Sequence, residues 1–245
     1  MAIQHEVLIV GTGLAGLMAA MECCGKVDTG VISKVFPTRA HSVAAQGGIA
    51  AALGNVSDDT PEIHMYDTVK GSDFLGDQDV IEIMCEDAPR AIIELEHLGV
   101  PFSRLDNGKI NQRPFGGHTH ARAAFAADRT GHVVMHTLYG QCLRHNVNFY
   151  SEYFVTELLV ENGRCCGLVA YDIVNGEFHT FQAKAVLFAT GGCGQVFRST
   201  SNCQGLTGDG MVLAFRAGVP LEDMERFGYT EEELMRGVVN QPFKA

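Results

Sequence analysis

One histidine, His41, stands in the segment RAHSVAAQGGIAAAL (residues 39–53), whose other side chains are mostly small. An imidazole ring changes its charge near neutral pH, and its nitrogens are nucleophilic, so it can move a proton or form a bond. Gly47 and Gly48 leave the nearby backbone bare. A titratable ring beside such a backbone makes the segment a candidate for a ligand site. The alternative is an ordinary polar loop histidine.

A second candidate site is the run GTGLAG at residues 11–16, which fits the GxGxxG pattern. Gly11 permits a tight turn, Gly13 lets the backbone approach a pyrophosphate, and Gly16 lets a helix pack closely on a strand. The apolar run EVLIV (6–10) precedes the motif, a segment with helical spacing follows it, and TGVISK (29–34) resembles a second strand. This strand–helix–strand context is the one in which the motif binds a dinucleotide at the helix N-terminus.

The type of dinucleotide depends on the end of the second strand. A nicotinamide coenzyme usually needs an acidic residue there for its ribose, but this strand ends in Ser33 and Lys34. Another apolar strand, AVLFAT (185–190), is followed by Gly191-Gly192 late in the chain. A late strand that returns to the dinucleotide is typical of flavoproteins, so the sequence favours a flavin.

Further elements surround these motifs. Helical patterns cover 61–71, 77–98, 131–145 and a helix that opens in 207–218, and Pro89 should interrupt or kink the second of these. Three strand-like runs, beginning NFYSEYFVTELLV (148–160), predict an antiparallel meander, and Asn107-Gly108 predicts a hairpin turn. We expect an α/β fold: a Rossmann-like FAD-binding domain with a parallel sheet plus an antiparallel β meander. Its predicted extent is 1–225, and 226–245 is expected to be a short helical tail, with a capping box at Thr230 and Glu233.

Composition excludes several classes of function. The net charge of −11, from 18 basic and 29 acidic residues, argues against nucleic acid as a partner. No apolar run is long enough for a membrane span. None of the eight cysteines has CxxC spacing, and His132 and His136 lack the HExxH pattern, so we predict no metal site. Arg122, Asp128 and Arg129 are expected to form a local ion pair and a helix N-cap; a catalytic role for Arg122 is the less favoured alternative.

Six segments in order, VISKVFPTRAHSVAAQGGIAAAL, QRPFGG, FAADRTGH, MHTLYGQCLR, ATGGCG and TGDG, resemble the flavoprotein subunit of succinate dehydrogenases and fumarate reductases. The resemblance runs from about residue 5 to residue 225, and TRAHSVAAQGG is its most specific part. It implies that a ring nitrogen of His41 bonds covalently to the 8α carbon of FAD. An electron-withdrawing substituent of this kind raises the flavin potential, which favours hydride uptake from succinate.

The resemblance also implies roles for other positions. The FAD-contacting residues would be Gly11, Gly13, Ala15, Gly16, Ser33, Lys34, Arg39, Ala40, His41, Ser42, Gln46, Gly47, Gly48, Val155, Thr190, Gly191 and Asp209. Val155 would contact the adenine through its backbone. Gly47 and Phe115 would lie near the substrate. The family's capping domain, with its proton-transferring arginine, has no matching motif here, so no catalytic acid or base is predicted.

The implied function is the interconversion of succinate and fumarate by hydride transfer. An iron–sulfur subunit would pass the electrons to membrane anchor subunits and quinone, which would place the chain in the cytoplasm, peripheral on the inner face of the cell membrane. Two alternatives stay open. One is a soluble oxidase of the L-aspartate oxidase type, whose FAD is not covalent; the other is an inactive FAD-binding fragment.

Overall fold

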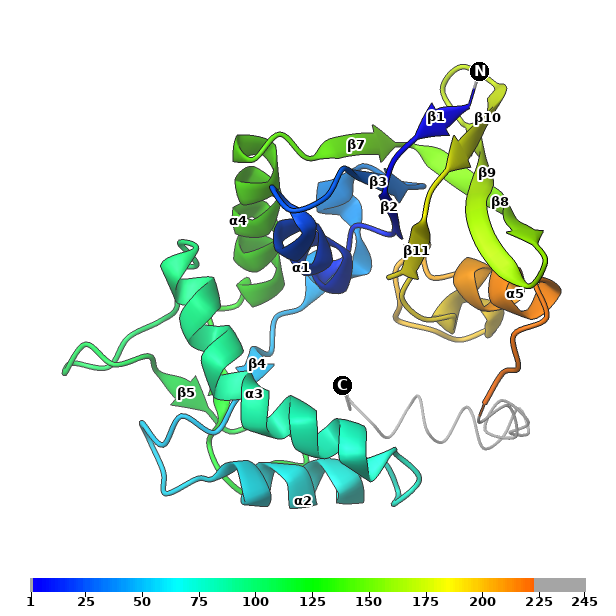
Figure 1. Cartoon of the computed structure of the whole chain (residues 1–245). Helices are drawn as coiled ribbons and strands as arrows, with labels where there is room; N and C mark the ends of the chain where they lie inside the picture. Colours follow the sequence, from blue (N-terminus) through cyan, green and yellow to red (C-terminus); the bar gives the residue numbers. More distant parts are fainter. Residues whose placement is uncertain (1, 223–245) are drawn as a thin grey trace. The chain divides into compact units, whose positions relative to one another are not determined.

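The computed structural model describes residues 2–222, which form two compact units (Figure 1). The first unit contains the chain up to Ser42 and again from Leu138 onward, and the second contains Val43–Thr137. The boundary proposed at 225/226 and the capping box at Thr230 lie outside the described residues.

The first unit is built on a parallel sheet of four strands: β2 (Val7–Val10), β3 (Thr29–Ser33), β7 (Asn148–Ser151) and β11 (Ala185–Phe188). Their order is β11-β2-β3-β7. Strand β3 is buried along its whole length, as expected for a parallel strand covered on both faces. Helix α1 (Leu14–Cys23) connects β2 to β3, which confirms the predicted strand–helix–strand unit.

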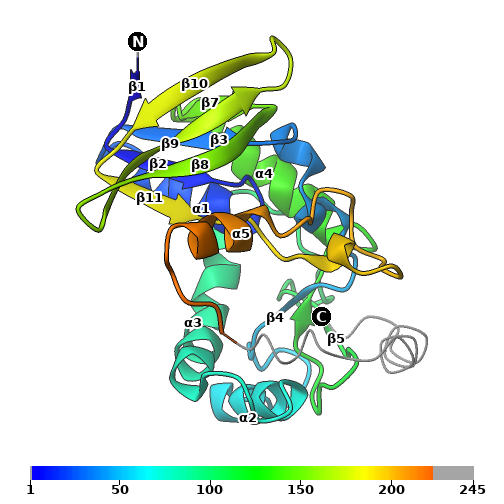
Figure 2. The same ribbon diagram turned by 90° about the vertical axis from the view of Figure 1, so that its right-hand side faces the viewer.

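An antiparallel meander packs against this parallel sheet. It consists of β8 (Tyr153–Glu161), β9 (Arg164–Asp172) and β10 (Glu177–Gln182), and the short strand β1 (Ile3–Gln4) pairs with β10. Leu8 and Ile32 of the parallel sheet share a buried core with Leu168 and Phe181 of the meander. Figure 2 shows α1 on the opposite side of the parallel sheet from the meander. The first unit therefore has three layers, and the predicted fold class is confirmed.

The run 148–160 was wrongly predicted as a single strand of the meander. It divides at Glu152, which has a φ of 64°, into β7 and β8. Strand β7 pairs parallel with β3, whereas β8 pairs antiparallel with β9. A left-handed residue redirects the chain, and the alternation of apolar side chains on its two sides does not reveal this change of sheet. Strand β1 was not predicted.

The second unit holds helices α2 (Pro61–Gly71) and α3 (Gln78–His97) and a small sheet of β4 (Ile49–Ala50), β6 (Ala123–Ala124) and β5 (Gln112–Arg113). Helix α4 (Thr130–Arg144) begins in this unit and ends in the first. The Thr60 hydroxyl caps α2 by accepting from Ile63 N, and the Asp77 carboxylate caps α3. The predicted turn at Asn107-Gly108 lies between Arg104 and Ile110, which form an antiparallel bridge.

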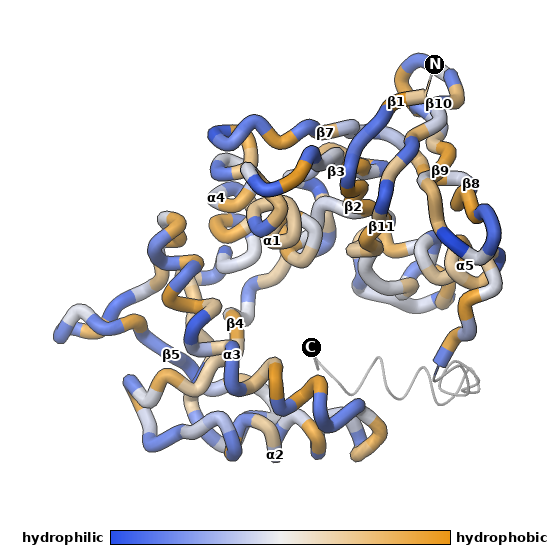
Figure 3. The backbone as a smooth tube through the Cα atoms, viewed as in Figure 1, coloured by the Kyte–Doolittle hydropathy of each residue, from blue (hydrophilic) through white to orange (hydrophobic). Residues whose placement is uncertain are grey.

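Helix α3 runs without interruption through Pro89, so of the two expected effects, an interruption or a kink, the interruption is wrong. Its buried residues Ile81, Cys85, Ile92 and Leu95 share one face. Its exposed residues mix charged side chains with the apolar side chains of Val80, Ile83, Met84 and Ile93. Figure 3 shows the resulting alternation of apolar and polar segments along α3. Burial of this apolar face compensates for the stabilisation lost at Pro89, where the backbone has no N–H to donate a helix hydrogen bond. No helix in residues 2–222 is both long and apolar enough to cross a bilayer.

Candidate dinucleotide site

The glycine motif forms the turn between β2 and α1, and its glycines are needed for different reasons. Gly11 has a φ of 113°, and a Cβ there would lie 2.2 Å from the Ala189 carbonyl oxygen. A Cβ at Gly16 would lie 2.0 Å from the Gly11 carbonyl oxygen. Gly13 is the N-cap of α1, and a Cβ there would meet only the Ser42 hydroxyl, at 3.3 Å. Gly11 and Gly16 thus close the turn, whereas Gly13 keeps the first turn of the helix open to a ligand.

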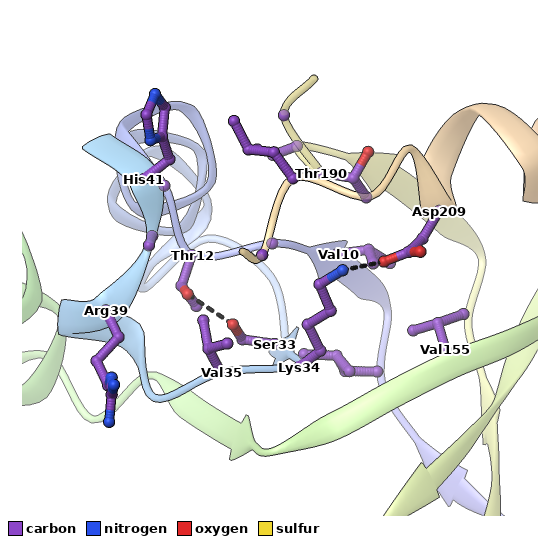
Figure 4. Close-up of a pocket in the computed structure, with 18 of the residues that line it drawn as sticks. Val10, Thr12, Ser33, Lys34, Val35, Arg39, His41, Val155, Thr190 and Asp209 are labelled. Carbon is purple, nitrogen blue, oxygen red and sulfur yellow. Dashed lines mark hydrogen bonds and ion pairs between the residues drawn. The ribbon is translucent and has the colours of Figure 1, made fainter. Parts of the chain in front are cut away.

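This turn lies at one end of a pocket in the first unit, with an empty volume of about 760 Å³ that includes its mouth (Figure 4). The predicted residues that line the pocket are Gly11, Gly13, Ser33, Lys34, Arg39, Ala40, His41, Ser42, Val155, Thr190, Gly191 and Asp209. Segments as distant in sequence as 11–13 and 189–191 therefore meet at one site.

Polar contacts tie the loops around the pocket together. The hydroxyls of Thr12 and Ser33 are hydrogen-bonded at 2.8 Å. The Lys34 ammonium contacts the Asp209 carboxylate and lies 2.5 Å from the Thr207 hydroxyl. Figure 4 shows the contact between Thr12 and Ser33 and the contact between Lys34 and Asp209. Asp209 is the first residue of α5 (Asp209–Arg216), so the ion pair joins the end of β3 to the start of this helix.

His41 lies at the start of a short 3-10 helix, η2 (His41–Ala44), and its side chain is exposed at the rim of the pocket. Its Nδ1 accepts a hydrogen bond of 3.3 Å from the backbone N–H of Cys203. An Nδ1 that accepts a hydrogen bond carries no hydrogen in the neutral ring, so the ring hydrogen is on Nε2. Nε2 has no hydrogen-bond partner within residues 2–222.

Val155 lies on β8, which is the edge strand of its sheet, so one side of its backbone is not used by that sheet. The register between β8 and β9 shifts between Val155 and Glu157, which indicates a bulge beside the pocket. The Val155 side chain is buried in the core. This leaves main-chain atoms for a ligand contact, as the resemblance implied.

Some predicted residues lie elsewhere. The Ala15 side chain is exposed on α1, and Gly16 packs against Gly11. Gln46, Gly47, Gly48 and Phe115 belong to the second unit. There the predicted substrate pair does meet, because a Cβ at Gly47 would lie 2.7 Å from the Phe115 ring.

Sequence reasoning missed the other pocket residues, which are Val10, Thr12, Ile32, Val35, Tyr153, Phe154, Ala189, Cys203, Gly205, Leu206 and Leu213. Thr12 had a signal, because it stands between two motif glycines. The run 203–206 had none, because no pattern links it to the glycine motif. Tyr153 and Phe154 were hidden by the prediction of a single strand through 148–160.

Arg122 forms a different ion pair from the one expected. Its guanidinium is fully buried and lies 2.9 Å from an Asp59 carboxylate oxygen and 2.8 Å from an Asp67 oxygen, so the predicted pair with Asp128 is wrong. Burial by itself raises the pKa of Asp67, but hydrogen bonds from Thr119 and the charge of Arg122 bring it below its usual value. Burial, together with the Arg122 charge, lowers the pKa of His64 to about 4. The cluster carries opposite charges in a dry interior.

Comparison with known proteins gives one consistent picture. The chain is 56% identical over 231 residues to the succinate dehydrogenase flavoprotein subunit of Rickettsia bellii, covering 91% of this chain and 39% of the relative. It is 47% identical to the fumarate reductase flavoprotein subunit of Mycobacterium tuberculosis. A structure of quinol-fumarate reductase with menaquinol molecules matches 91% of this chain, with a TM-score of 0.85 and 41% identity. The chain thus spans about 39% of the length of the Rickettsia relative.

The pocket fits the cofactor that this comparison implies. FAD carries a pyrophosphate, and the open first turn of α1 at Gly13 supplies backbone N–H groups without a Cβ in the way. FAD also has two flat ring systems, and apolar side chains of Val10, Ile32 and Leu213 line the same cavity. Residues 6–230 match the FAD binding domain family, and the chain belongs to that family.

Proposed function

We propose that this chain is the FAD-binding part of a succinate dehydrogenase or fumarate reductase flavoprotein subunit, in which residues 1–225 form the FAD-binding domain. The observation that carries the proposal is the pocket of the first unit, which gathers the glycine turn, the end of β3, His41 and the 189–191 loop around one cavity. The identity with succinate dehydrogenase flavoprotein subunits supports this assignment.

The pyrophosphate of FAD is placed at Gly11 and Gly13, where the start of α1 offers N–H donors and a positive dipole end. Ser33, which is hydrogen-bonded to Thr12, stands at the end of β3, where a dinucleotide ribose is usually bound. The adenine lies against the backbone of Val155. Thr190 and Gly191 close over the diphosphate, and Asp209 is held toward FAD by Lys34.

His41 is proposed to bond covalently to FAD through Nε2. The Cys203 N–H donates to Nδ1, which leaves Nε2 for the bond. Forming the bond would remove the hydrogen of Nε2 and one hydrogen of the 8α carbon as protons, and the flavin ring would take up the two electrons that they leave behind. Bound FAD supplies the chemistry of accepting a hydride from succinate or returning one to fumarate. Phe115 would lie beside the substrate and exclude water, and Gly47 would contact the substrate carboxylate. The transfer of the second hydrogen, as a proton, is not assigned to a residue of this chain.

An iron–sulfur subunit and membrane anchor subunits are the proposed partners. They would pass electrons to a quinone in succinate oxidation, or receive them from its quinol in fumarate reduction. The chain would then sit in the cytoplasm, peripheral on the inner face of the membrane. The name of the matched quinol-fumarate reductase structure supports a quinone-linked complex.

The covalent bond can be tested on the purified 245-residue chain. After denaturing electrophoresis in acid, wild-type protein should show flavin fluorescence on its band, and His41→Ala should lose it. Cys203→Ala keeps the backbone N–H and serves as the control that should retain the fluorescence. A fluorescent His41→Ala band, or a wild-type band without fluorescence after incubation with FAD and succinate, would contradict covalent attachment.

A second candidate function is flavin binding without turnover. It is favoured by the pocket of the first unit, whose lining includes neither Gly47 nor Phe115, the two residues expected near the substrate. The two candidates differ in succinate-dependent reduction of an artificial dye. Dye reduction by the FAD-loaded chain supports the oxidoreductase, and a flavin-loaded chain that reduces no dye supports the binding function.

A further inference from the structure

Arg113, on β5 of the second unit, contacts two consecutive carbonyl groups. Its Nε donates to the Gly47 oxygen at 2.8 Å, and a terminal guanidinium nitrogen donates to the Gln46 oxygen. The guanidinium also lies over the Phe125 ring, 4.4 Å from its centroid. The guanidinium therefore donates hydrogen bonds along one edge and packs one face on the Phe125 ring. These contacts together fix its orientation.

Holding the two carbonyl groups in place also sets the direction of the N–H group that follows each of them in the chain. In a trans peptide the C=O and the N–H of one plane point in opposite directions, and the Gln46 oxygen shares a plane with the Gly47 N–H. The Gly47 oxygen likewise shares a plane with the Gly48 N–H. Arg113 therefore turns both N–H groups to the side away from itself. Within residues 2–222 neither amide donates a hydrogen bond to another group.

Glycine is needed at both positions for this geometry. A Cβ at Gly48 would lie 2.7 Å from the Ala124 carbonyl oxygen, and Gly48 has a φ of 124°. At Gly47 a Cβ would meet the Phe115 ring. Two bare, adjacent N–H groups beside an aromatic ring make a concave donor site for an anionic oxygen.

We propose that Arg113 is a positioning residue that turns the Gly47 and Gly48 amides into a paired donor site for a negatively charged or carbonyl oxygen. A cation that donates to both carbonyls polarises their peptide groups, which strengthens the opposite N–H groups as donors. The oxygen belongs either to a carboxylate of a dicarboxylate substrate or to the flavin ring. Only this choice of ligand rests on the proposed function.

The orientation of the amides is tested without ligand, on uniformly ¹⁵N-labelled chain. Arg113→Met keeps an unbranched stem over Phe125 but removes the charge and all donors, and Arg113→Lys keeps the charge without the planar fork. Both should shift and broaden the Gly47 and Gly48 amide resonances, Met more than Lys. Arg104→Lys is the matched control, because Arg104 also donates to a glycine carbonyl, Gly108, at 3.1 Å. Unchanged resonances in Arg113→Met would overturn the proposal.

The ligand is tested by titrating the same protein separately with malonate, a non-reacting dicarboxylate, and with FAD. One of them should move the two glycine amides downfield in a saturable way, and that response identifies the source of the oxygen. In Arg113→Met the affinity for the same ligand should fall about tenfold, because hydrogen bonds to a charged oxygen are lost. A structural role alone would lower the melting temperature without this selective loss.

If neither ligand moves the two amides, the donor site is refuted. The gel test of His41 is independent of these measurements. A chain without covalent flavin but with the expected malonate response would therefore disprove the covalent linkage and leave the role of Arg113 standing.

Discussion

At the scale of single residues, the burial of a charge decides how much an ion pair matters. Arg122 and its partners Asp59 and Asp67 are almost completely buried, whereas Arg90 and Asp87 on α3 are more than half exposed. Breaking a buried pair leaves an uncompensated charge in the interior, but water replaces the partner of an exposed one. The two arginines should therefore respond very differently to the same substitution.

Arg122→Met should lower the free energy of unfolding by about 3–5 kcal/mol, because two carboxylates would lose their counter-charge in a dry interior. Arg90→Met should cost at most about 1 kcal/mol. Urea denaturation followed by circular dichroism measures both. Equal losses for the two variants would show that the buried cluster contributes no more than a surface pair.

At the scale of elements, helix α1 approaches the turn before it closely. Gly16 makes this approach possible, and the Leu17 carbonyl beside it lies within 3.7 Å of the Cys142 sulfur on α4. Helix α1 is thus held on both sides, so its N-terminus is set rigidly toward the pocket. Edge strand β8 contributes in a different way, because it brings an unused backbone edge to the same cavity.

Gly16→Ala should lower the free energy of unfolding by at least about 2 kcal/mol and weaken FAD binding, because its Cβ would lie 2.0 Å from the Gly11 carbonyl oxygen. Gly140→Ala, within α4, is the control. No atom lies within 4 Å of a Cβ there, and alanine favours a helix, so stability should stay equal or rise by about 0.5–1 kcal/mol. Thermal unfolding and FAD fluorescence quenching measure the two effects. Unimpaired FAD binding in Gly16→Ala would contradict the placement of the pyrophosphate.

At the scale of the whole molecule, stability should depend on pH through the buried histidines. The pKa of His64 is lowered to about 4 from an ordinary value of 6.5, and burial lowers the pKa of His118 in the same direction. Between pH 6.5 and pH 4, His64 binds a proton in the unfolded chain but not in the folded chain. The folded state is therefore destabilised progressively as the pH falls from 6.5 to 4.

The expected loss for His64 over this range is on the order of 3 kcal/mol. Asp67 acts at lower pH, because its pKa lies below 3.8 and its contribution is lost only as that carboxylate is protonated. Urea denaturation at a series of pH values measures the slope. His64→Gln should flatten it, and His97→Gln, at an exposed position on α3, should not. An unchanged slope in His64→Gln would assign the dependence to other groups.

The sequence by itself determined the local parts of this protein. GTGLAG between an apolar strand and a helix predicts its own turn, because the three glycines act within six residues. The helix beginning at Pro61 and the turn at Asn107-Gly108 were also local, since proline and glycine restrict the backbone wherever they stand. The family resemblance added further pocket residues, including Val155 and Asp209, which no spacing rule connects to the motif.

Tertiary structure decided what depends on partners distant in the chain. The division of 148–160 between two sheets depends on pairing with β3 and β9, and the choice of Asp59 and Asp67 over Asp128 depends on where Arg122 is buried. Likewise, the contact of His41 with Cys203 joins residues 162 positions apart. Such contacts are set by packing, because the free energy of burying a charge or a strand depends on everything around it, which a local pattern does not contain.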